Sequence, residues 1–246
     1  MSTAEAAWTR DTSPRTVARI AGALFLLTIL TGGLAQGLVS ERLIDPTNAA
    51  ATARSILGHP SLCHFGFAMY LVEMACQVAM TAVFYHLLRP VGRNLSLLAA
   101  LMGLTGCVIK TFSRVFFVVP LLVLRDPHTL GAFDEAQRQA LAMLLFDVND
   151  RGAAMALVFF GIASVVKGYL IHRSTFLPRV LGVLGMICGL GWLTFLVPPV
   201  GYRLLFYVVP IGVLGALVQI GWLLVRGVDE VRWKEQAERA SASLWR

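Results

Sequence analysis

The sequence predicts an all-α polytopic membrane protein, a bundle of six transmembrane helices. Of the 246 residues, 57% are apolar and only 14% are charged, whereas soluble domains carry about 25% charged residues. Apolar runs of roughly 20 residues, long enough to cross a bilayer as a helix, occur six times along the chain. They cover residues 17–39, 62–88, 95–124, 152–171, 180–200 and 204–225.

The positions of the basic residues predict the orientation. One side of the bundle holds Arg42, Arg54, Arg125, Arg138, Arg151 and Arg203, and the side of both termini holds the majority of the Lys and Arg residues. Since basic residues collect on the cytoplasmic side, we expect cytoplasmic tails at 1–16 and 226–246 around a membrane domain at 17–225. The first run is expected to be a retained span and not a cleaved signal peptide.

The net charge of +7 would suggest a nucleic-acid partner in a soluble protein. Here the inner-side arginines and lysines account for it, so no nucleic acid is expected and the lipid bilayer is the expected partner. No C-x-x-C pair occurs among the four cysteines, which argues against a disulfide or a zinc site. Haem would need two facing histidines, and only His86 with His172 comes close; no cofactor or metal is expected.

Two short helices are expected on the outer surface. Asp45 as N-cap, Pro46 as first residue and Gly58 at the end predict one helix within residues 45–60. Apolar residues at helical spacing predict another over 133–148, lying on lipid or on the bundle, with a lid over an outward-facing cavity as the alternative. The tail after residue 226 has paired charges four residues apart, which is typical of a solvated helix.

Three charges interrupt the apolar runs: Glu73 in the second, and Lys110 and Arg114 in the third. A charge at bilayer depth costs at least ~2.5–3.5 kcal/mol, so each needs a partner, a water-filled cavity or a function. Counting residues from the outer ends of the antiparallel runs puts Glu73 level with Arg114, and Gln77 level with Lys110. The sequence therefore predicts a ladder of two polar rungs, Glu73/Arg114 and Gln77/Lys110.

Two interpretations of this cluster stay open. It could be a buried clamp that fixes the register of two helices, or a functional site. One carboxylate faces two cations, and an uncompensated buried cation indicates an anionic ligand or a titratable group. A small anionic solute or a lipid headgroup is therefore a candidate partner. Asp147 and Asp150, at the outer rim before the fourth run, could bind a hard cation or screen Arg114, although a solvated loop end is the simpler interpretation.

One segment identifies a family. Residues 168–185 read GYLIHRSTFLPRVLGVLG, residues 19–26 read RIAGALFL, and Asp45 precedes AAATA at 49–53. With Phe159-Phe160-Gly161 before the long segment, these features resemble the bacterial membrane family known as domain of unknown function 4386, over roughly residues 15–225. The resemblance implies a multi-span inner-membrane protein with no established activity. Physically, Arg173, Ser174, Pro178 and Arg179 are typical of a tight cytoplasmic turn whose proline fixes the start of the fifth span.

Function stays divided between two classes. The first is a non-catalytic accessory, regulatory or scaffold component of the membrane. The second is a small-solute or ion transporter, anion-selective or proton-coupled, that uses the Glu/Arg/Lys cluster. An enzyme is disfavoured because the chain has no H-E-x-x-H, no G-x-S-x-G and no paired intramembrane acids.

Overall fold

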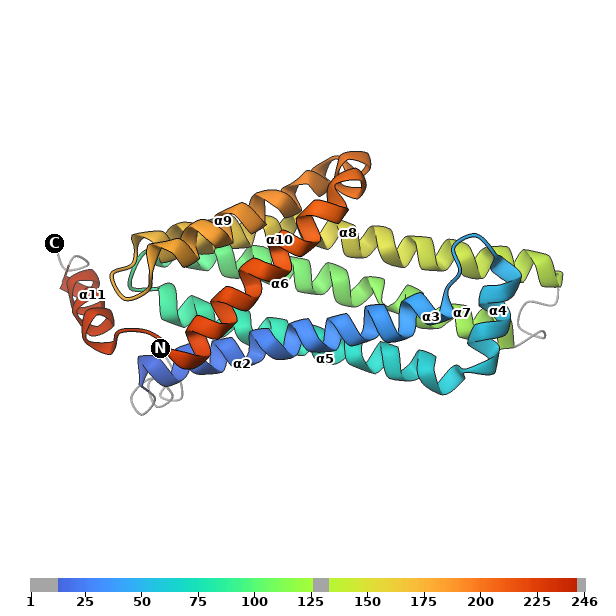
Figure 1. Ribbon diagram of the computed structural model, residues 1–246, viewed down its shortest axis with the longest axis horizontal. Coiled ribbons are helices and arrows are strands. Elements are labelled where there is room, and N and C mark those ends of the chain that lie inside the picture. Colours follow the sequence, from blue (N-terminus) through green and yellow to red (C-terminus); the bar gives the residue numbers. More distant parts are fainter. Residues whose placement is uncertain (1–12, 126–132, 243–246) are drawn as a thin grey trace. The chain divides into compact units, whose positions relative to one another are not determined.

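The chain is built from helices. The computed structural model describes residues 13–125 and 133–242, so the prediction for the tail 1–16 falls outside it except for residues 13–16. The helices, in chain order, are α2 (Pro14–Gly33), η1 (Leu34–Ser40), α3 (Glu41–Leu43), α4 (Ala49–Gly58), α5 (Pro60–Leu88), α6 (Arg93–Ser113), α7 (Val115–Arg125), α8 (Glu135–Arg173), α9 (Arg179–Leu193), η2 (Thr194–Leu196), α10 (Pro198–Val225) and α11 (Glu230–Ala242) (Figure 1).

Six helical stretches are long and apolar enough to cross a membrane. They are Pro14–Leu43, Pro60–Leu88, Arg93–Arg125, Glu135–Arg173, Arg179–Leu196 and Pro198–Val225. Each carries large apolar side chains on its outside, a surface that suits lipid and not water. Since a helix pairs its backbone N–H and C=O groups within itself, it is one of the few structures stable in hydrocarbon. The predicted all-α architecture with six spans is confirmed.

Two span boundaries were predicted wrongly. The helix α8 runs without a break from Glu135 to Arg173, so the expected surface helix over 133–148 is the first part of the fourth long helix. No proline lies between these residues, and Gly152 does not stop the helix because a single glycine is tolerated in a helix interior. The fifth and sixth helices meet at Val197 and not after residue 200, because Pro198 takes the first position of α10.

Residues contact one another in two compact units, which we describe separately. Of the described residues, 13–26, 78–104 and 158–242 belong to unit 1, and 27–77, 105–125 and 133–157 belong to unit 2. The core of unit 1 is formed by buried apolar side chains of α2, α5, α8, α9 and α10 and of the turn before α9. The core of unit 2 comes from η1, α3, α4, α5, α7 and α8.

In unit 1, helices α8 and α9 approach each other closely at glycines. A Cβ on Gly168 would lie 2.6 Å from the carbonyl oxygen of Gly182, and a Cβ on Gly189 would lie 2.7 Å from that of Gly161. The glycines spaced four residues apart at 185 and 189 therefore form a small-residue face that packs against another helix. The glycines at 33 and 37 have the same spacing but form no such contact, since nothing in the described chain lies within 4 Å of a Cβ placed there.

In unit 2, the predicted first short helix is present as α4, which lies crosswise to α5 (Figure 1). It begins later than expected. Its N-cap is Asn48, whose side-chain oxygen accepts a hydrogen bond from the N–H of Ala51 at 2.9 Å. Asp45 instead closes a turn, because its Oδ1 accepts hydrogen bonds from the N–H and the hydroxyl of Thr47 at 2.9 and 2.7 Å.

Candidate functional site

The candidate site is a group of charged and polar side chains in unit 2. Glu73 and Gln77 lie on α5, Lys110 lies on α6, and Arg114 is the residue between α6 and α7. Glu73 and Arg114 are buried, and Lys110 and Gln77 are partly buried. The structure therefore brings together the intramembrane charges that the sequence singled out.

The partner of Glu73 differs from the predicted one. Lys110 Nζ donates a hydrogen bond to Glu73 Oε1 at 2.5 Å and forms an ion pair with it, so the predicted Glu73/Arg114 rung is wrong. Counting residues locates a Cα to within about one turn, 5.4 Å, and the four-carbon stem of a lysine spans that distance. The predicted Gln77/Lys110 rung stays a prediction.

Arg114 has different partners. Its guanidinium lies over the ring of Tyr70, with Cζ 3.7 Å from the ring centroid, and its Nη1 donates a hydrogen bond to Asn149 Oδ1 at 3.1 Å. The stacked ring and the amide oxygen both favour a cation. The buried cation is thus stabilised by α5 and α8.

A local break in the third span positions Arg114. Its backbone N–H is shared between the carbonyl oxygens of Lys110 and Thr111, at 3.3 and 3.2 Å, and the hydroxyl of Ser113 also donates to the oxygen of Lys110, at 2.7 Å. Competition for one carbonyl bends a helix. Pro120, inside α7, removes a further backbone donor one to two turns later.

A second carboxylate extends the cluster. Asn149 Nδ2 donates a hydrogen bond to Asp150 Oδ1 at 2.9 Å, so the exposed Asp150 connects through the buried Asn149 to Arg114. With Asp150 included, two carboxylates accompany two cations, which removes the excess positive charge left open by the sequence. This geometry is compatible with the interpretation that Asp150 screens the charge of Arg114. Asp147 instead pairs with Arg151 at 2.7 Å in an exposed salt bridge, and both acids lie inside α8 and not in a loop.

The buried carboxylate lies against the backbone of α2. A Cβ placed on Gly32 would lie 2.9 Å from both Cδ and Oε1 of Glu73, so a side chain at residue 32 would require the Glu73 carboxylate to shift away from its present position. Two polar atoms of the cluster, Glu73 Oε2 and Arg114 Nε, are buried without a hydrogen-bond partner in the described chain. Such atoms carry a desolvation cost of about 1–3 kcal/mol each.

Sequence reasoning missed Tyr70 and Gly32. Tyr70 is three residues before Glu73 and so lies on the same helix face. This spacing could have predicted that Tyr70 belongs to the cluster. Its hydroxyl donates to Gln36 Oε1 at 2.9 Å. Gln36 lies in the π-helix η1, a rare geometry often found at functional sites. Phe117 packs edge-on against the Tyr70 ring.

The residues of the predicted turn motif lie in unit 1. The helix α9 begins at Arg179, directly after Pro178 in an extended conformation. Ser174 is buried and its hydroxyl donates to the carbonyl oxygen of Ile171 at 2.8 Å, closing α8. Arg173 donates to the hydroxyl of Tyr169 at 3.1 Å. These contacts serve the turn itself.

The two histidines considered for haem, His86 and His172, lie in unit 1. The ring of His86 lies beside that of Trp233, 6.1 Å between centroids, and Nδ1 of His172 is buried without a hydrogen bond in the described chain. Within residues 13–125 and 133–242, no three His, Cys, Asp or Glu side chains come together as metal ligands.

Six long apolar helices and a charged cluster buried among them are the features of a multi-pass α-helical membrane protein. The sequence model of the family described as Domain of unknown function, DUF4386, matches residues 20–227. The chain therefore belongs to the DUF4386 family. It is also similar to an uncharacterised protein of Archaeoglobus fulgidus, with 28% identity over 127 residues that cover 52% of this chain and 60% of that relative. The match thus spans less than two thirds of the relative's length, and no solved structure matches the chain.

Proposed function

We propose that this chain is a non-catalytic component of the inner membrane, with an accessory, regulatory or scaffold role and both termini in the cytoplasm. In this proposal the charged cluster clamps the helices of unit 2 and does not line a path for a solute. The observation that carries the proposal is the ion pair of Glu73 and Lys110, covered by the backbone of α2 at Gly32.

The packing around the cluster supports a dry clamp. A carboxylate that conducts a solute needs open space beside it, whereas a single added methyl group on Gly32 would already collide with Glu73. On the other side, Arg114 is stacked on Tyr70 and bonded to Asn149. Charges held by rings, amides and each other in this way tie helices α5, α6 and α8 together.

The accessibility of thiols beside the cluster tests this proposal. Cys107 lies one turn before Lys110 and is buried, and Gln77→Cys places a second thiol one turn after Glu73. We expect both, each as the sole cysteine of the chain, to resist a water-soluble thiol reagent in intact membranes and to react after denaturation. Arg151→Cys, at an exposed position, is the matched reactive control. Labelling of the two cluster thiols at the rate of this control would contradict the dry clamp.

A second candidate, a small-anion or proton-coupled transporter, is favoured by one observation. Glu73 Oε2 and Arg114 Nε are buried and unpartnered, and the chain Asp150–Asn149–Arg114 reaches from an exposed carboxylate to the cluster. A free carboxylate oxygen can take up a proton, and a free guanidinium N–H can bind an anion. Anions should then raise the unfolding temperature of the wild type more than that of Arg114→Gln, and equal shifts would reject this candidate.

A further inference from the structure

A basic groove lies in unit 1, between the turn that joins α5 to α6 and the C-terminal helix α11. Its volume is about 860 Å³, and His86, Arg89, Arg93, Trp233, Gln236 and Arg239 are among its lining residues. None of the described residues that line it is acidic. Three arginines around one open space make it a site of strongly positive potential.

Two of these arginines have no acidic partner among the residues that the structure describes. Arg239 is paired with Glu235 at 3.6 Å on the surface of α11, whereas no carboxylate of the described chain forms an ion pair with Arg89 or Arg93. Arg93 is also the first residue of α6, and Asn94 and Leu95 follow it along the groove. The first N–H groups of a helix have no partner within it and favour an anion.

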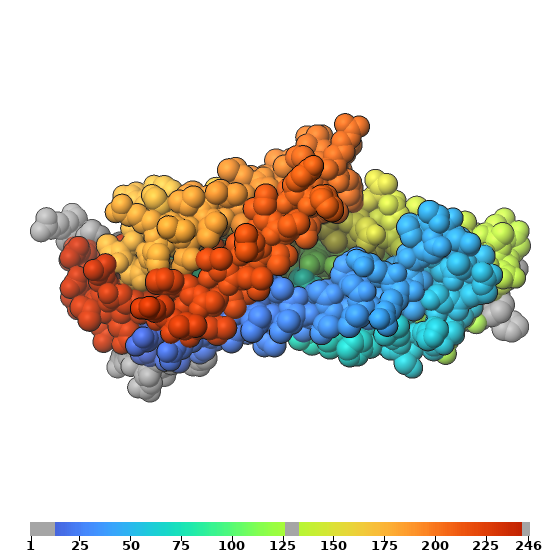
Figure 2. Space-filling view, viewed as in Figure 1, coloured from blue at the N-terminus to red at the C-terminus, as the bar shows by residue number. Residues whose placement is uncertain are grey.

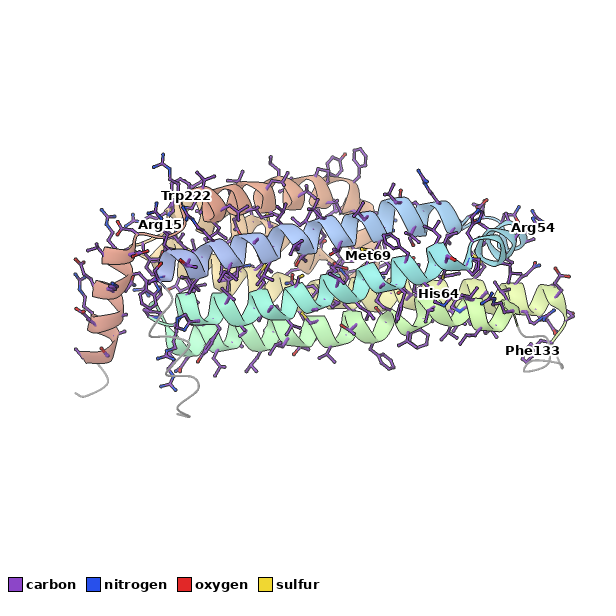
Figure 3. The ribbon with its side chains drawn as sticks, turned by 90° about the horizontal axis from the view of Figure 1, so that it is seen from below. Arg15, Arg54, His64, Met69, Phe133 and Trp222 are labelled. Atoms are coloured by element: carbon purple, nitrogen blue, oxygen red, sulfur yellow. The ribbon has the colours of Figure 1, made fainter. Side chains whose placement is uncertain are left out.

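The neighbouring groove in unit 1 differs in this respect. It has a volume of about 640 Å³ and is lined by Arg15, Arg226 and Arg232 together with Asp229 and Glu230. Arg15 and Trp222, close together in Figure 3, lie on its wall. Arg15 Nε donates to the carbonyl oxygen of Arg226 at 3.3 Å, and Arg232 pairs with Asp229 at 3.4 Å. Its basic groups are thus largely engaged within the protein.

The helix α11 forms one wall of the basic groove and is held there by specific contacts. Trp233 Nε1 donates to the carbonyl oxygen of Leu87 at 2.9 Å, which caps the end of α5. The side-chain oxygen of Gln236 accepts hydrogen bonds from the N–H and the hydroxyl of Thr175, at 3.1 and 3.0 Å. In the space-filling view the red atoms of α11 lie directly against the turn that holds Thr175 (Figure 2).

The groove continues into an apolar surface. Leu95 lines the groove and is itself exposed, and Leu98 and Leu101, exposed as well, follow at helical spacing along α6. A ligand that reaches from the arginines onto these leucines needs an anionic head and an apolar tail. We propose that the basic groove binds the phosphate headgroup of an anionic phospholipid, whose acyl chains lie along Leu95, Leu98 and Leu101.

Lipid retention by the purified full-length chain tests the proposal. The protein is reconstituted with equal amounts of phosphatidylglycerol and phosphatidylcholine, and the bound lipids are measured by native mass spectrometry. We expect the wild type to prefer phosphatidylglycerol and Arg89→Gln/Arg93→Gln to lose that preference about ten- to thirty-fold, the scale set by two basic residues at an anionic headgroup. The control Arg42→Gln/Arg54→Gln, exposed arginines of unit 2, should retain it.

Two further arms keep the test independent of misfolding and of other anions. Trp233→Ala leaves every arginine in place but removes one of the contacts that hold α11, so it should weaken the preference too. Inorganic phosphate added to the protein in neutral detergent should raise the unfolding temperature less than phosphatidylglycerol does. Any of three results would overturn the proposal. The first two are a ratio of bound phosphatidylglycerol to phosphatidylcholine that equals the wild-type ratio in the double arginine variant, or in Trp233→Ala. The third is a rise in unfolding temperature with phosphate as large as that with phosphatidylglycerol.

Discussion

The buried ion pair of Glu73 and Lys110 should dominate the stability of unit 2. Only 8% of the Glu73 side chain and 16% of the Lys110 side chain are exposed, and Nζ lies 2.5 Å from Oε1. Removing one partner of such a pair leaves an uncompensated buried charge, which costs about 3–5 kcal/mol. Glu73→Gln should therefore lower the free energy of unfolding by that amount, equivalent to a fall of roughly 6–20 °C in Tm.

The matched control is the salt bridge of Asp147 and Arg151. Its length is similar, 2.7 Å, but its side chains are 51% and 70% exposed. Exposed pairs contribute about 0–1 kcal/mol because water and salt screen them, so Asp147→Asn should change the free energy of unfolding by less than about 1 kcal/mol.

A double-mutant cycle isolates the interaction within the buried pair. Glu73→Gln/Lys110→Met removes both charges, and we expect it to recover most of the stability lost in Glu73→Gln, because no unpaired ion of the pair is left. The assay is unfolding in mixed micelles titrated with a denaturing detergent and followed by circular dichroism. The reasoning would be refuted if the coupling energy were no larger than the ~0.6 kcal/mol average for polar contacts inside membrane bundles.

Three further predictions follow from the contacts around the pair. Gly32→Ala should destabilise the protein by about 1–3 kcal/mol in the same assay, whereas Gly33→Ala, with nothing within 4 Å of the new Cβ, should be neutral or stabilising; equal effects would contradict the close approach of α2. Asn149→Leu should lower the free energy of unfolding by about 1.5–3 kcal/mol, because Arg114 loses its amide acceptor. An unchanged free energy of unfolding would show that this hydrogen bond does not stabilise the protein. Hydrogen bonds from the threonine two positions later lower the pKa of Asp45, so its contribution to the turn before α4 is complete above the ordinary pKa and is lost as the pH falls through the lowered folded value. Hydrogen-exchange protection of α4 should follow that loss, and Asp45→Asn should abolish the pH dependence.

The lengths of the apolar runs were enough to predict the architecture, because a segment inside lipid must pair its own backbone polar groups and a helix does so. The boundaries were harder, since the polar first part of α8 and its apolar remainder form one helix from Glu135 to Arg173. Amphipathic and fully apolar patterns both have the helical period, and nothing in the pattern separates two helices from one. Pro198 did carry a usable signal for the start of α10.

The members of the candidate site were predictable, but their partners were not. The free-energy cost of placing a charge inside the bilayer was enough to single out Glu73, Lys110 and Arg114. Pairing depends on helix rotation, on the break at Arg114 and on long flexible side chains, none of which a count of residues contains. The ring of Tyr70 was overlooked because an aromatic residue in an apolar span is usually packing, and its role requires a cation on another helix.

Exchanging the two charges of the buried pair tests the central claim, that they hold the helices together by neutralising each other. We predict that Glu73→Lys and Lys110→Glu alone each prevent accumulation of folded protein in the membrane. The exchanged variant Glu73→Lys/Lys110→Glu should accumulate and unfold within a few degrees of the wild type. If the exchanged variant accumulates no better than the single reversals, the clamp is contradicted.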